Sequence, residues 1–437
     1  MATRPALTDS ARGCALRVVR RVFEQGAYAD RALAAEAVEL DPRDRALATQ
    51  IAYGTVQRRA TLDHVARSLV RRPLEQLEPP VLAAIRIGLF QLLYLERVPS
   101  HAVVDESVEL AKRESRGGAG VVNAVLRRAA REGEALLSGL EDATPAGAAL
   151  LHSVPAWLAD MWWTELGPDE ARALLRQVNE PAEAALRVNS LVATVDEVAA
   201  SLPVPSAPAP APAAATLGAV PEGLVLGAPF DAHGSELWRR GAITPQSRGS
   251  MLVARVLAPV PGDRVLDLCA APGAKTTHLA ALIEDRGGVL AVERHPGRAR
   301  SLELNRRRMH AGSVEVAVAD AAELELRRRF DRVLVDPPCS GLGTLQSRPD
   351  RRWRASPRAI EELAALQARI LAAGAAATRS GGALVYSVCT ISRREAQGVI
   401  EPFLAANPEW TADGAVQLLP HRDGADGFFI ARLRRGS

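Results

Sequence analysis

The sequence predicts an α/β protein with a doubly wound, mostly parallel β-sheet in its C-terminal half and an all-helical domain before it. Two observations support this fold class. In the first 140 residues apolar side chains recur every three or four positions, as at Leu16, Val19 and Val22, which is the period of an amphipathic helix. Beyond about residue 240, short β-rich runs alternate with longer helical patterns, as in sheets whose parallel strands are joined by helices.

Length and composition fit a soluble chain of several domains. The 437 residues are 48% apolar and 24% charged, so two or three globular domains are expected. Lysine and arginine total 54 against 51 acidic residues, and the net charge of +3 neither requires nor excludes nucleic acid. No apolar run reaches the roughly 18–20 residues that span a bilayer, and the first ten residues lack an apolar signal segment. We therefore expect a cytoplasmic protein that does not enter membranes.

Cysteine and histidine usage predicts neither a disulfide framework nor a metal site. The cysteines, none of them in a CxxC pair, are Cys14, Cys269, Cys339 and Cys389. The 8 histidines are scattered singly, so we expect no bound metal. Only Lys112 and Lys275 are lysines in a chain whose other basic residues are arginines, which makes a lysine at a candidate site informative.

Three regions follow one another along the chain. Residues 1–140 are predicted to form the all-helical domain, 145–240 a small α+β linker subdomain, and 241–437 the domain with the parallel sheet. Within the linker, residues 202–216 form a run rich in proline and alanine. Such a run favours extended, solvated backbone, and we expect a surface loop.

The third region contains six predicted strands and four predicted helices. The strands, identified by short β-rich runs, are 264–269, 288–293, 314–319, 332–336, 383–388 and 428–433. The helices are 275–284, 296–309, 357–377 and 393–405. Ligands of such sheets bind beyond the carboxyl ends of the strands, so the residues directly after each strand are the candidates for a site.

The first candidate is the turn in VLDLCAAPGAKTTHL, between a strand and a helix. Small residues allow the turn to approach a ligand closely, and the helix N-terminus presents free N–H groups. The glycine spacing is neither that of a phosphate loop nor GxGxxG. With Asp267 beside it, the turn suits a nucleoside bearing an amino acid better than a pyrophosphate. The candidate cofactor-binding residues here are Cys269, Ala270, Ala271, Pro272, Gly273, Ala274 and Lys275.

Acidic residues end the next two strands. Glu293 follows the glycine turn by about 20 residues, the usual position of a carboxylate that binds the ribose hydroxyls of an adenosine cofactor. Asp320 could hold an adenine edge or could equally be a helix N-cap. Arg298 is expected to be a surface helix residue. Glu293 and Asp320 are therefore further cofactor candidates.

The most specific segment is DRVLVDPPCSGLG. Two prolines cannot continue a central strand, so the chain turns sharply after Asp336 and brings Asp336 and Cys339 into the crevice. A cysteine where DPPY would have tyrosine indicates chemistry on a pyrimidine ring carbon rather than on an exocyclic amine. In ALVYSVCT another strand delivers Cys389 to the same edge, so two thiols can meet over one substrate.

As a set, DLCAAPGAKT, DPPCSG and YSVCT resemble the motifs of the RsmB/NOP family of RNA 5-methylcytosine methyltransferases. The resemblance extends over nearly the whole chain. The segment DRALATQIAYGTVQRRATLDHV is similar to the NusB-like RNA-binding domain of the bacterial ribosomal member, and PAWLADMWWTELG and LRVN are similar to the family's linker subdomain. The resemblance implies a Rossmann-like class I methyltransferase domain, S-adenosylmethionine as cofactor, and RNA, above all 16S ribosomal RNA, as partner.

The chemistry of cytosine explains why such a site needs a thiol. Carbon 5 is a poor nucleophile until a thiolate adds to carbon 6, which is a form of covalent catalysis. The resemblance assigns Cys389 as the nucleophile and Cys339 as the residue that aids product release. The residues alone do not rank the two, and Cys339 remains a rival because the Pro-Cys cysteine is the nucleophile in DNA cytosine methyltransferases. Asp336 could bind the base edge or the cofactor, and Lys275 could support the base or the thiolate.

Arginines after the catalytic turn suggest a loop that clamps RNA, although a solvated basic loop is the alternative. The residues concerned are Arg348, Arg351, Arg352, Trp353, Arg354 and Arg358. The helical domain adds four more arginines, which are Arg58, Arg59, Arg71 and Arg72.

Three departures from the family pattern are Ala274 in place of a second glycine, Ser247 in place of an aspartate, and Glu395-Ala396-Gln397 where Glu-Asn is common. We expect cofactor binding to survive the first, whereas Ser247 could weaken a polar contact near the cofactor. Because none of the three departures touches the cysteines, we expect activity to remain. The alternative functions are a non-catalytic RNA-binding or antitermination factor, and a cytosine-5 methyltransferase acting on transfer RNA or DNA. We expect a monomer.

Overall fold

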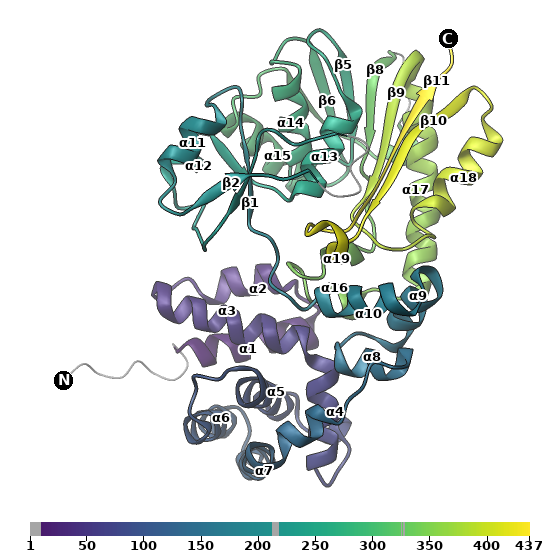
Figure 1. Cartoon of the computed structure of the whole chain (residues 1–437). Coiled ribbons are helices and arrows are strands. Elements are labelled where there is room, and N and C mark those ends of the chain that lie inside the picture. The colour runs from purple at the N-terminus through teal and green to yellow at the C-terminus, as the bar shows by residue number, and fades with distance from the viewer. Residues whose placement is uncertain (1–9, 212–217, 325, 327) are drawn as a thin grey trace. The chain divides into compact units, whose positions relative to one another are not determined.

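The computed structural model describes residues 10–211, 218–324, 326 and 328–437. The chain forms two compact units, shown in Figure 1. The helical unit comprises Met1–Asn179 and Leu345–Arg354, and the sheet unit comprises Glu180–Thr344 and Ala355–Ser437. Across the described part of the chain, no helix combines the length and apolar character needed to cross a bilayer.

The helical unit is the all-α bundle that the apolar period predicts. Its core includes Cys14, Ile51 and Leu126, all fully buried. Gly54 allows close helix packing, because a Cβ there would lie only 2.0 Å from the Phe90 ring. The helices are α1 (Ala11–Gln25), α2 (Ala29–Glu36), α3 (Pro42–Gln57), α4 (Arg59–Leu69), η2 (Leu74–Gln76), α5 (Pro79–Tyr94), α6 (Ser100–Glu114), α7 (Gly118–Ser138), α8 (Pro145–Leu151), α9 (Ala156–Leu166), α10 (Pro168–Gln177) and α16 (Arg351–Arg354).

The segment Leu345–Arg354, distant in sequence, completes the helical unit. Arg352 is fully buried in it. Its guanidinium donates hydrogen bonds to the Ser153 carbonyl at 3.0 Å, the Val178 carbonyl at 3.1 Å and the Asn179 side-chain oxygen at 2.9 Å. One arginine thus supplies the donors for several carbonyl groups that are shielded from water.

The expected RNA clamp is therefore wrong for two of its members. Arg352 is enclosed by its hydrogen-bond acceptors, and the Trp353 indole N–H donates to the Val56 carbonyl at 2.7 Å. Neither group is available to phosphate or base, because Arg352 is buried and the Trp353 ring packs against the bundle core and beneath the Arg59 guanidinium. Arg348 and Arg358, by contrast, are exposed.

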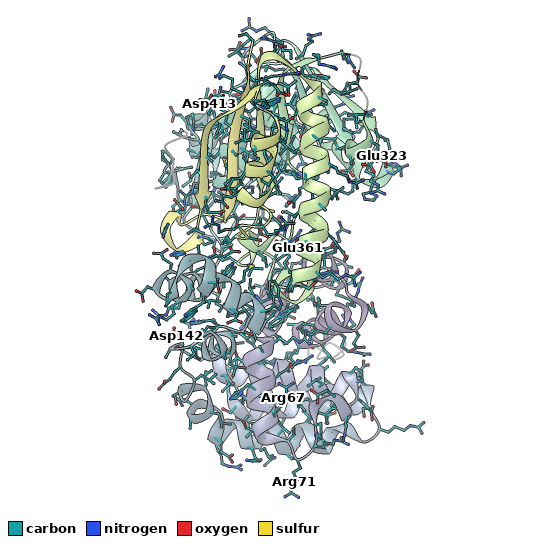
Figure 2. The ribbon with its side chains drawn as sticks, turned by 90° about the vertical axis from the view of Figure 1, so that its right-hand side faces the viewer. Arg67, Arg71, Asp142, Glu323, Glu361 and Asp413 are labelled. Atoms are coloured by element: carbon teal, nitrogen blue, oxygen red, sulfur yellow. The ribbon has the colours of Figure 1, made fainter. Side chains whose placement is uncertain are left out.

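The arginines predicted on the helical domain also divide into two kinds. Arg58 stacks on the Tyr94 ring with 4.9 Å between its guanidinium carbon and the ring centroid, and is half-buried. Arg71 and Arg72 follow α4 and are exposed, and Arg71 projects outward in Figure 2. Of these, the last two are free of the bundle core and suited to phosphate contacts.

The sheet unit contains the predicted doubly wound sheet, with strand order β10-β11-β9-β8-β5-β6-β7. The pairs among β9, β8, β5, β6 and β7 are parallel, and β11 and β10 add to the β9 side in antiparallel fashion. The predicted fold class is confirmed, and β10 is a strand that the sequence pattern did not reveal. The strands are β5 (Arg264–Leu268), β6 (Gly288–Glu293), β7 (Val314–Val318), β8 (Phe330–Val335), β9 (Thr378–Val388), β10 (Trp410–Leu418) and β11 (Phe428–Arg435).

Helices cover both faces of this sheet (Figure 1). Neighbouring strand residues alternate between the two layers, so that Leu334 packs into the layer with α13 and α14, while Val333 and Val335 pack into the layer with α17 and α18. The helices of these layers, with the short turns between them, are α13 (Arg248–Leu257), α14 (Ala274–Leu282), α15 (Pro296–Arg308), η3 (Ala321–Glu323), η4 (Leu342–Thr344), α17 (Pro357–Ala377), α18 (Gln397–Ala406) and α19 (Pro420–Asp423).

A second sheet in this unit is small and antiparallel, with strand order β2-β3-β1-β4. Part of the run 202–216, expected to be a loop, is its edge strand, where a proline is tolerated because one side of the strand pairs with no neighbour. Residues 212–216 of that run lie outside the described residues. The elements are β1 (Ala185–Val188), α11 (Val195–Ser201), β2 (Ser206–Pro208), β3 (Gly223–Leu226), α12 (Glu236–Arg239) and β4 (Ile243–Pro245).

Replacing Arg352 with leucine should destabilise the helical unit. Several buried carbonyls would lose their donor, and the free energy of unfolding should fall by about 3 kcal/mol. Denaturant unfolding followed by circular dichroism, with hydrogen exchange in α3, measures this. The matched control is Arg358→Leu, at a side chain that is 91% exposed, which should change stability by less than about 0.5 kcal/mol. If both variants lowered the free energy of unfolding by the same amount, the proposed anchoring role of Arg352 would be contradicted.

Candidate active site

The candidate site lies at the carboxyl ends of three adjacent strands of the large sheet. β5 lies between β6 and β8, and β9 lies on the other side of β8. Because these strands are parallel, the residues that follow them emerge at one edge. Cys269 follows β5, Asp336 follows β8, and Cys389 follows β9. The topology therefore gathers the sequence-predicted residues that come after these strands.

The turn between β5 and α14 has the backbone of a close-approach loop. Cys269 and Gly273 have positive φ angles of 67° and 103°. A Cβ at Gly273 would lie 2.4 Å from the Leu302 side chain, so glycine is required both for its conformation and for the packing of α15. The next residue, Ala274, is the first of α14, and its methyl group is accommodated there.

Helix α15 holds this turn from outside. Arg298 donates a hydrogen bond to the Ala271 carbonyl at 2.5 Å, and Asn305 donates to the Pro272 carbonyl at 3.2 Å. Arg298 was expected to be a surface residue. Its side chain is half exposed, but its guanidinium fixes the loop.

Asp267 lies beneath the turn. Its Oδ2 accepts a hydrogen bond from the Thr276 hydroxyl at 2.6 Å. Burial, followed by the charge of Asp336, raises the pKa of Asp267 to about 7. Its Oδ1 is buried and has no hydrogen-bond partner within the described ranges. The carboxyl group thus ties the end of β5 to the first turn of α14.

A pocket opens beside the turn and encloses about 470 Å³ of empty space, part of it open to solvent. Its lining includes Cys269, Glu293, Asp320 and Pro338. Glu293 is 3% exposed, and its Oε1 accepts the backbone N–H of His295 at 2.9 Å. Its Oε2 lies 3.5 Å from Arg298 and accepts no hydrogen bond from any described residue. A buried carboxylate oxygen without a donor suits a hydroxyl-bearing ligand.

Asp320 caps a short helix and also lines the pocket, so its position is compatible with both roles that the sequence left open. Its Oδ1 accepts the backbone N–H of Ala322 at 3.0 Å and so caps η3, while its side chain also lines the pocket. Its Oδ2 lies 3.4 Å from Arg294. One carboxylate oxygen is therefore structural, and the residue still borders the space that a ligand would fill.

Lys275 and Asp336 form an ion pair at the edge of the site. The Lys275 ammonium donates to Asp336 Oδ2 at 2.8 Å, and the Ser387 hydroxyl donates to Asp336 Oδ1 at 2.8 Å. Burial lowers the pKa of Lys275, but Asp336, and after it Cys389 and Asp267, outweigh burial and raise the pKa above its ordinary value. The lysine is therefore a fixed positive charge within electrostatic reach of Cys389.

The two candidate thiols meet, as their positions after parallel strands predict. The sulfurs of Cys339 and Cys389 are 3.3 Å apart. Their loops are also joined through backbone, because the Gly343 N–H donates to the Cys389 carbonyl at 3.0 Å. Cys269 differs from them: burial, and then the charge of Asp336, raise its pKa to about 12, which keeps it a neutral thiol.

Sequence reasoning missed the polar groups behind the cysteines. Ser340 and Thr390, each directly after a cysteine, have hydroxyl oxygens 2.7 Å apart, and both contact the buried Glu395. The only available signal was their adjacency to the cysteines in sequence.

Arg187 was also missed, although it is fully buried and donates to Gln246 at 2.8 Å and to Thr277 at 2.9 Å.

The remaining expectations concern Ser247 and metals. Ser247 is the N-cap residue of α13, one position after the glutamine that Arg187 contacts. Over the described residues, the structure holds no cluster of three or more histidine, cysteine or acidic side chains arranged to bind a metal ion.

Comparison with known proteins connects this geometry to a family. The profile described as "16S rRNA methyltransferase RsmB/F" matches residues 254–434. A NusB family profile matches residues 9–131, and a ferredoxin-like domain profile of RsmF/B-like methyltransferases matches residues 154–233. Together the three profiles match the N-terminal helices, the strands β1, β2 and β3 of the small sheet, and the large sheet.

Whole-length relatives agree. The chain is 35% identical over 453 residues to the probable ribosomal RNA small subunit methyltransferase B of Synechocystis, covering 98% of this chain and 99% of that one. It is 36% identical to ribosomal RNA small subunit methyltransferase B of Thermus thermophilus, with 90% and 89% covered.

Solved structures show the same architecture. The crystal structure of PH0851 superposes with a TM-score of 0.82 at 26% identity, covering 99% of both chains. NSun6 from Pyrococcus horikoshii with SFG has a TM-score of 0.60 at 23% identity, covers 66% of this chain and 100% of that one, and shows the shared fold. The chain therefore belongs to the RsmB/F methyltransferase family and has a NusB domain at its N-terminal end.

Proposed function

We propose that this enzyme methylates carbon 5 of a cytosine in small-subunit ribosomal RNA, using S-adenosylmethionine, through a covalent bond between Cys389 and the base. The observation that carries the proposal is the pair of thiols, 3.3 Å apart at the ends of adjacent parallel strands, beside the Lys275–Asp336 ion pair. Methylation of an exocyclic amine needs no thiol nucleophile. Methylation of carbon 5 of a pyrimidine does, because a thiolate must first add to carbon 6.

The pocket beside the β5–α14 turn fits the cofactor. Glu293 Oε2, which accepts no hydrogen bond from the described residues, can accept hydrogen bonds from ribose hydroxyls, and Asp320 borders the same space. The small residues of the turn, Ala270 to Ala274, permit close approach of the cofactor, and the N-terminus of α14 offers N–H groups. When bound, S-adenosylmethionine supplies an electrophilic sulfonium methyl group. Two comparisons support this choice of cofactor. The structure of NSun6, which has the same fold, is described as containing SFG, and the relative from Synechocystis is named as a methyltransferase.

The covalent step follows from the electronics of cytosine. The Cys389 thiolate adds to carbon 6, and the electron pair of the ring double bond moves so that carbon 5 becomes nucleophilic. Carbon 5 then takes the methyl group. Loss of the carbon-5 proton to a base restores the double bond and expels the Cys389 thiolate. The sulfur of Cys339, next to Cys389, is suited to take part in this release.

Charge at the site favours the first step. The Lys275 ammonium lies where it stabilises a Cys389 thiolate, since each charge favours the other. Asp336 holds that ammonium and has carboxylate oxygens that can accept a hydrogen bond from the base edge or contact the cofactor. Cys269 contributes packing at the turn rather than nucleophilicity, because its thiol remains protonated.

The choice of ribosomal RNA rests on the relatives and on the NusB domain. Two relatives of this chain, from Synechocystis and Thermus thermophilus, are named as ribosomal RNA small subunit methyltransferases B. The match covers 99% and 89% of their lengths. The exposed Arg71 and Arg72 of the helical unit are available to phosphates. The target cytosine must be unpaired or flipped out for carbon 6 to be reached.

Variants of the two cysteines separate their roles. Cys389→Ala should abolish methylation and leave no RNA adduct, because the carbon–sulfur bond cannot form. Cys339→Ala should retain bond formation but slow release, so that an RNA–protein adduct accumulates on a denaturing gel. Cys269→Ala is the control and should form no more adduct than the wild type. An adduct that persists in Cys389→Ala, especially with DNA, would instead identify Cys339 as the nucleophile.

Glu293→Gln should weaken S-adenosylmethionine binding by about 10- to 100-fold, because a hydroxyl would lose a charged acceptor in a buried setting. Isothermal titration calorimetry measures the dissociation constant. Glu303→Gln, at a partly exposed carboxylate of α15 that pairs with Arg306, provides the control. If the wild type shows no binding at all, a non-catalytic RNA-binding protein becomes the better explanation.

Deleting the gene should remove one 5-methylcytosine from 16S ribosomal RNA. Bisulfite sequencing of RNA from the deletion strain detects the loss, and the wild-type gene, but not one encoding Cys389→Ala, should restore it. Loss of a mark from transfer RNA with ribosomal RNA unchanged would contradict the substrate assignment.

A further inference from the structure

A buried carboxylate, Glu395, connects the loops that contain the two cysteines. Its side chain is completely enclosed. Oε1 accepts the backbone N–H of Ser340 at 2.8 Å and the side-chain amide of Gln367 at 3.0 Å. Oε2 contacts the Ser340 hydroxyl and lies 3.3 Å from the Thr390 hydroxyl. One carboxylate thus reaches the residues directly after both cysteines.

The hydrogen bonds around Glu395 have a single consistent direction. An ionised carboxylate only accepts, so the Ser340 hydroxyl donates to Glu395. The Thr390 hydroxyl lies 2.7 Å from the Ser340 oxygen and 3.3 Å from Glu395 Oε2, so its single proton is shared between these two acceptors. An amide nitrogen at position 395 would either oppose the Ser340 N–H and the Gln367 amide, which can only donate, or force the two hydroxyls at Oε2 to reverse their direction, and in both cases the negative charge is lost. The network therefore distinguishes glutamate from glutamine, although the two have nearly the same shape.

A second layer fixes this network to the scaffold. Gln367 projects from α17, and its amide also donates to the Pro338 carbonyl at 2.9 Å, directly before Cys339. The Tyr386 hydroxyl, from β9, lies 2.7 Å from the Glu395 carbonyl and 3.1 Å from the Gln367 side-chain oxygen. Helix α17 thereby holds the carboxylate of Glu395 and strand β9 holds its backbone, as rigid elements hold precise sites.

We propose that Glu395 is a positioning residue that sets the separation of the Cys339 and Cys389 sulfurs for attack on the base and release of the product. This inference rests on the proposed covalent function. Glu395 contacts the neighbours of the reacting sulfurs and not the sulfurs themselves, so it acts through loop geometry. Its loss should slow the chemistry while the side of the cofactor pocket that contains Glu293 and Asp320, which Glu395 does not contact, stays intact.

The test compares Glu395→Gln with Glu361→Gln. Glu361 is an exposed carboxylate on α17 that pairs with Arg394, and Figure 2 shows it on that helix. In single-turnover assays at saturating RNA and cofactor, Glu395→Gln should methylate about 100-fold more slowly, because small misplacements of reacting groups have effects of that size. Its dissociation constant for S-adenosylmethionine should stay within about twofold of the wild type, and Glu361→Gln should match the wild type in both.

A second measurement needs no RNA. Diamide takes up the two hydrogens of the Cys339 and Cys389 thiols as a disulfide forms, and mass spectrometry gives the rate of this reaction. Glu395→Gln should slow it about tenfold, because the sulfurs are no longer held together. Ser340→Ala removes one hydroxyl from the network and should slow both methylation and disulfide formation, but less than Glu395→Gln does. It replaces Glu395→Gln as the test variant if that protein does not fold.

The outcomes are distinct. Wild-type rates of methylation and disulfide formation in Glu395→Gln would overturn the proposal. So would a parallel loss of cofactor binding and of thermal stability, since that pattern marks a general role in folding. If the wild-type enzyme methylates no RNA, the proposed function fails, and the disulfide rates alone decide whether Glu395 positions the sulfurs.

Discussion

The 3.3 Å approach of two sulfurs depends on one constraint of the fold, the parallel pairing of β8 and β9. Parallel neighbours must end at the same edge, so loops 50 residues apart in sequence meet there. The rest of the site is arranged around that meeting point. Asp336, at the end of β8, receives hydrogen bonds from Lys275 after β5 and from Ser387 within β9. Three strands thus contribute to one charged cluster, and a slip in their register would separate its members.

Two buried carboxylates have different tasks at this edge. Asp267 ties β5 to α14 through Thr276 and is held in surroundings that raise its pKa to about 7. Glu395 lies on the side of α17 and receives donors from both cysteine loops. The first secures the turn beside the cofactor pocket, and the second secures the thiols. Asp267 therefore stabilises the scaffold, whereas Glu395 sets the geometry of the reacting groups.

Much of this arrangement can be predicted from sequence because its signals are local. Strand and helix periods predict the doubly wound sheet, and DPPC and VCT at strand ends predict the meeting of Cys339 and Cys389. Arg352 shows where such reasoning fails. Its arginine-rich neighbours suggest a solvent-facing RNA clamp, yet it is buried among carbonyl groups of helices far away in sequence. The contacts of Glu395 could not be predicted for the same reason, since its partners come from three separate segments.

The central claim is a transient bond between the sulfur of Cys389 and carbon 6 of cytosine. RNA that contains 5-fluorocytidine at the target tests it directly, because fluorine cannot leave as a proton does and the adduct is trapped after methyl transfer. Proteolysis and mass spectrometry then identify the attached residue. The account predicts a methylated nucleotide on the peptide that contains Cys389, formed only when S-adenosylmethionine is present. Attachment at Cys339, or methylation of normal RNA with no trapped adduct, would contradict it.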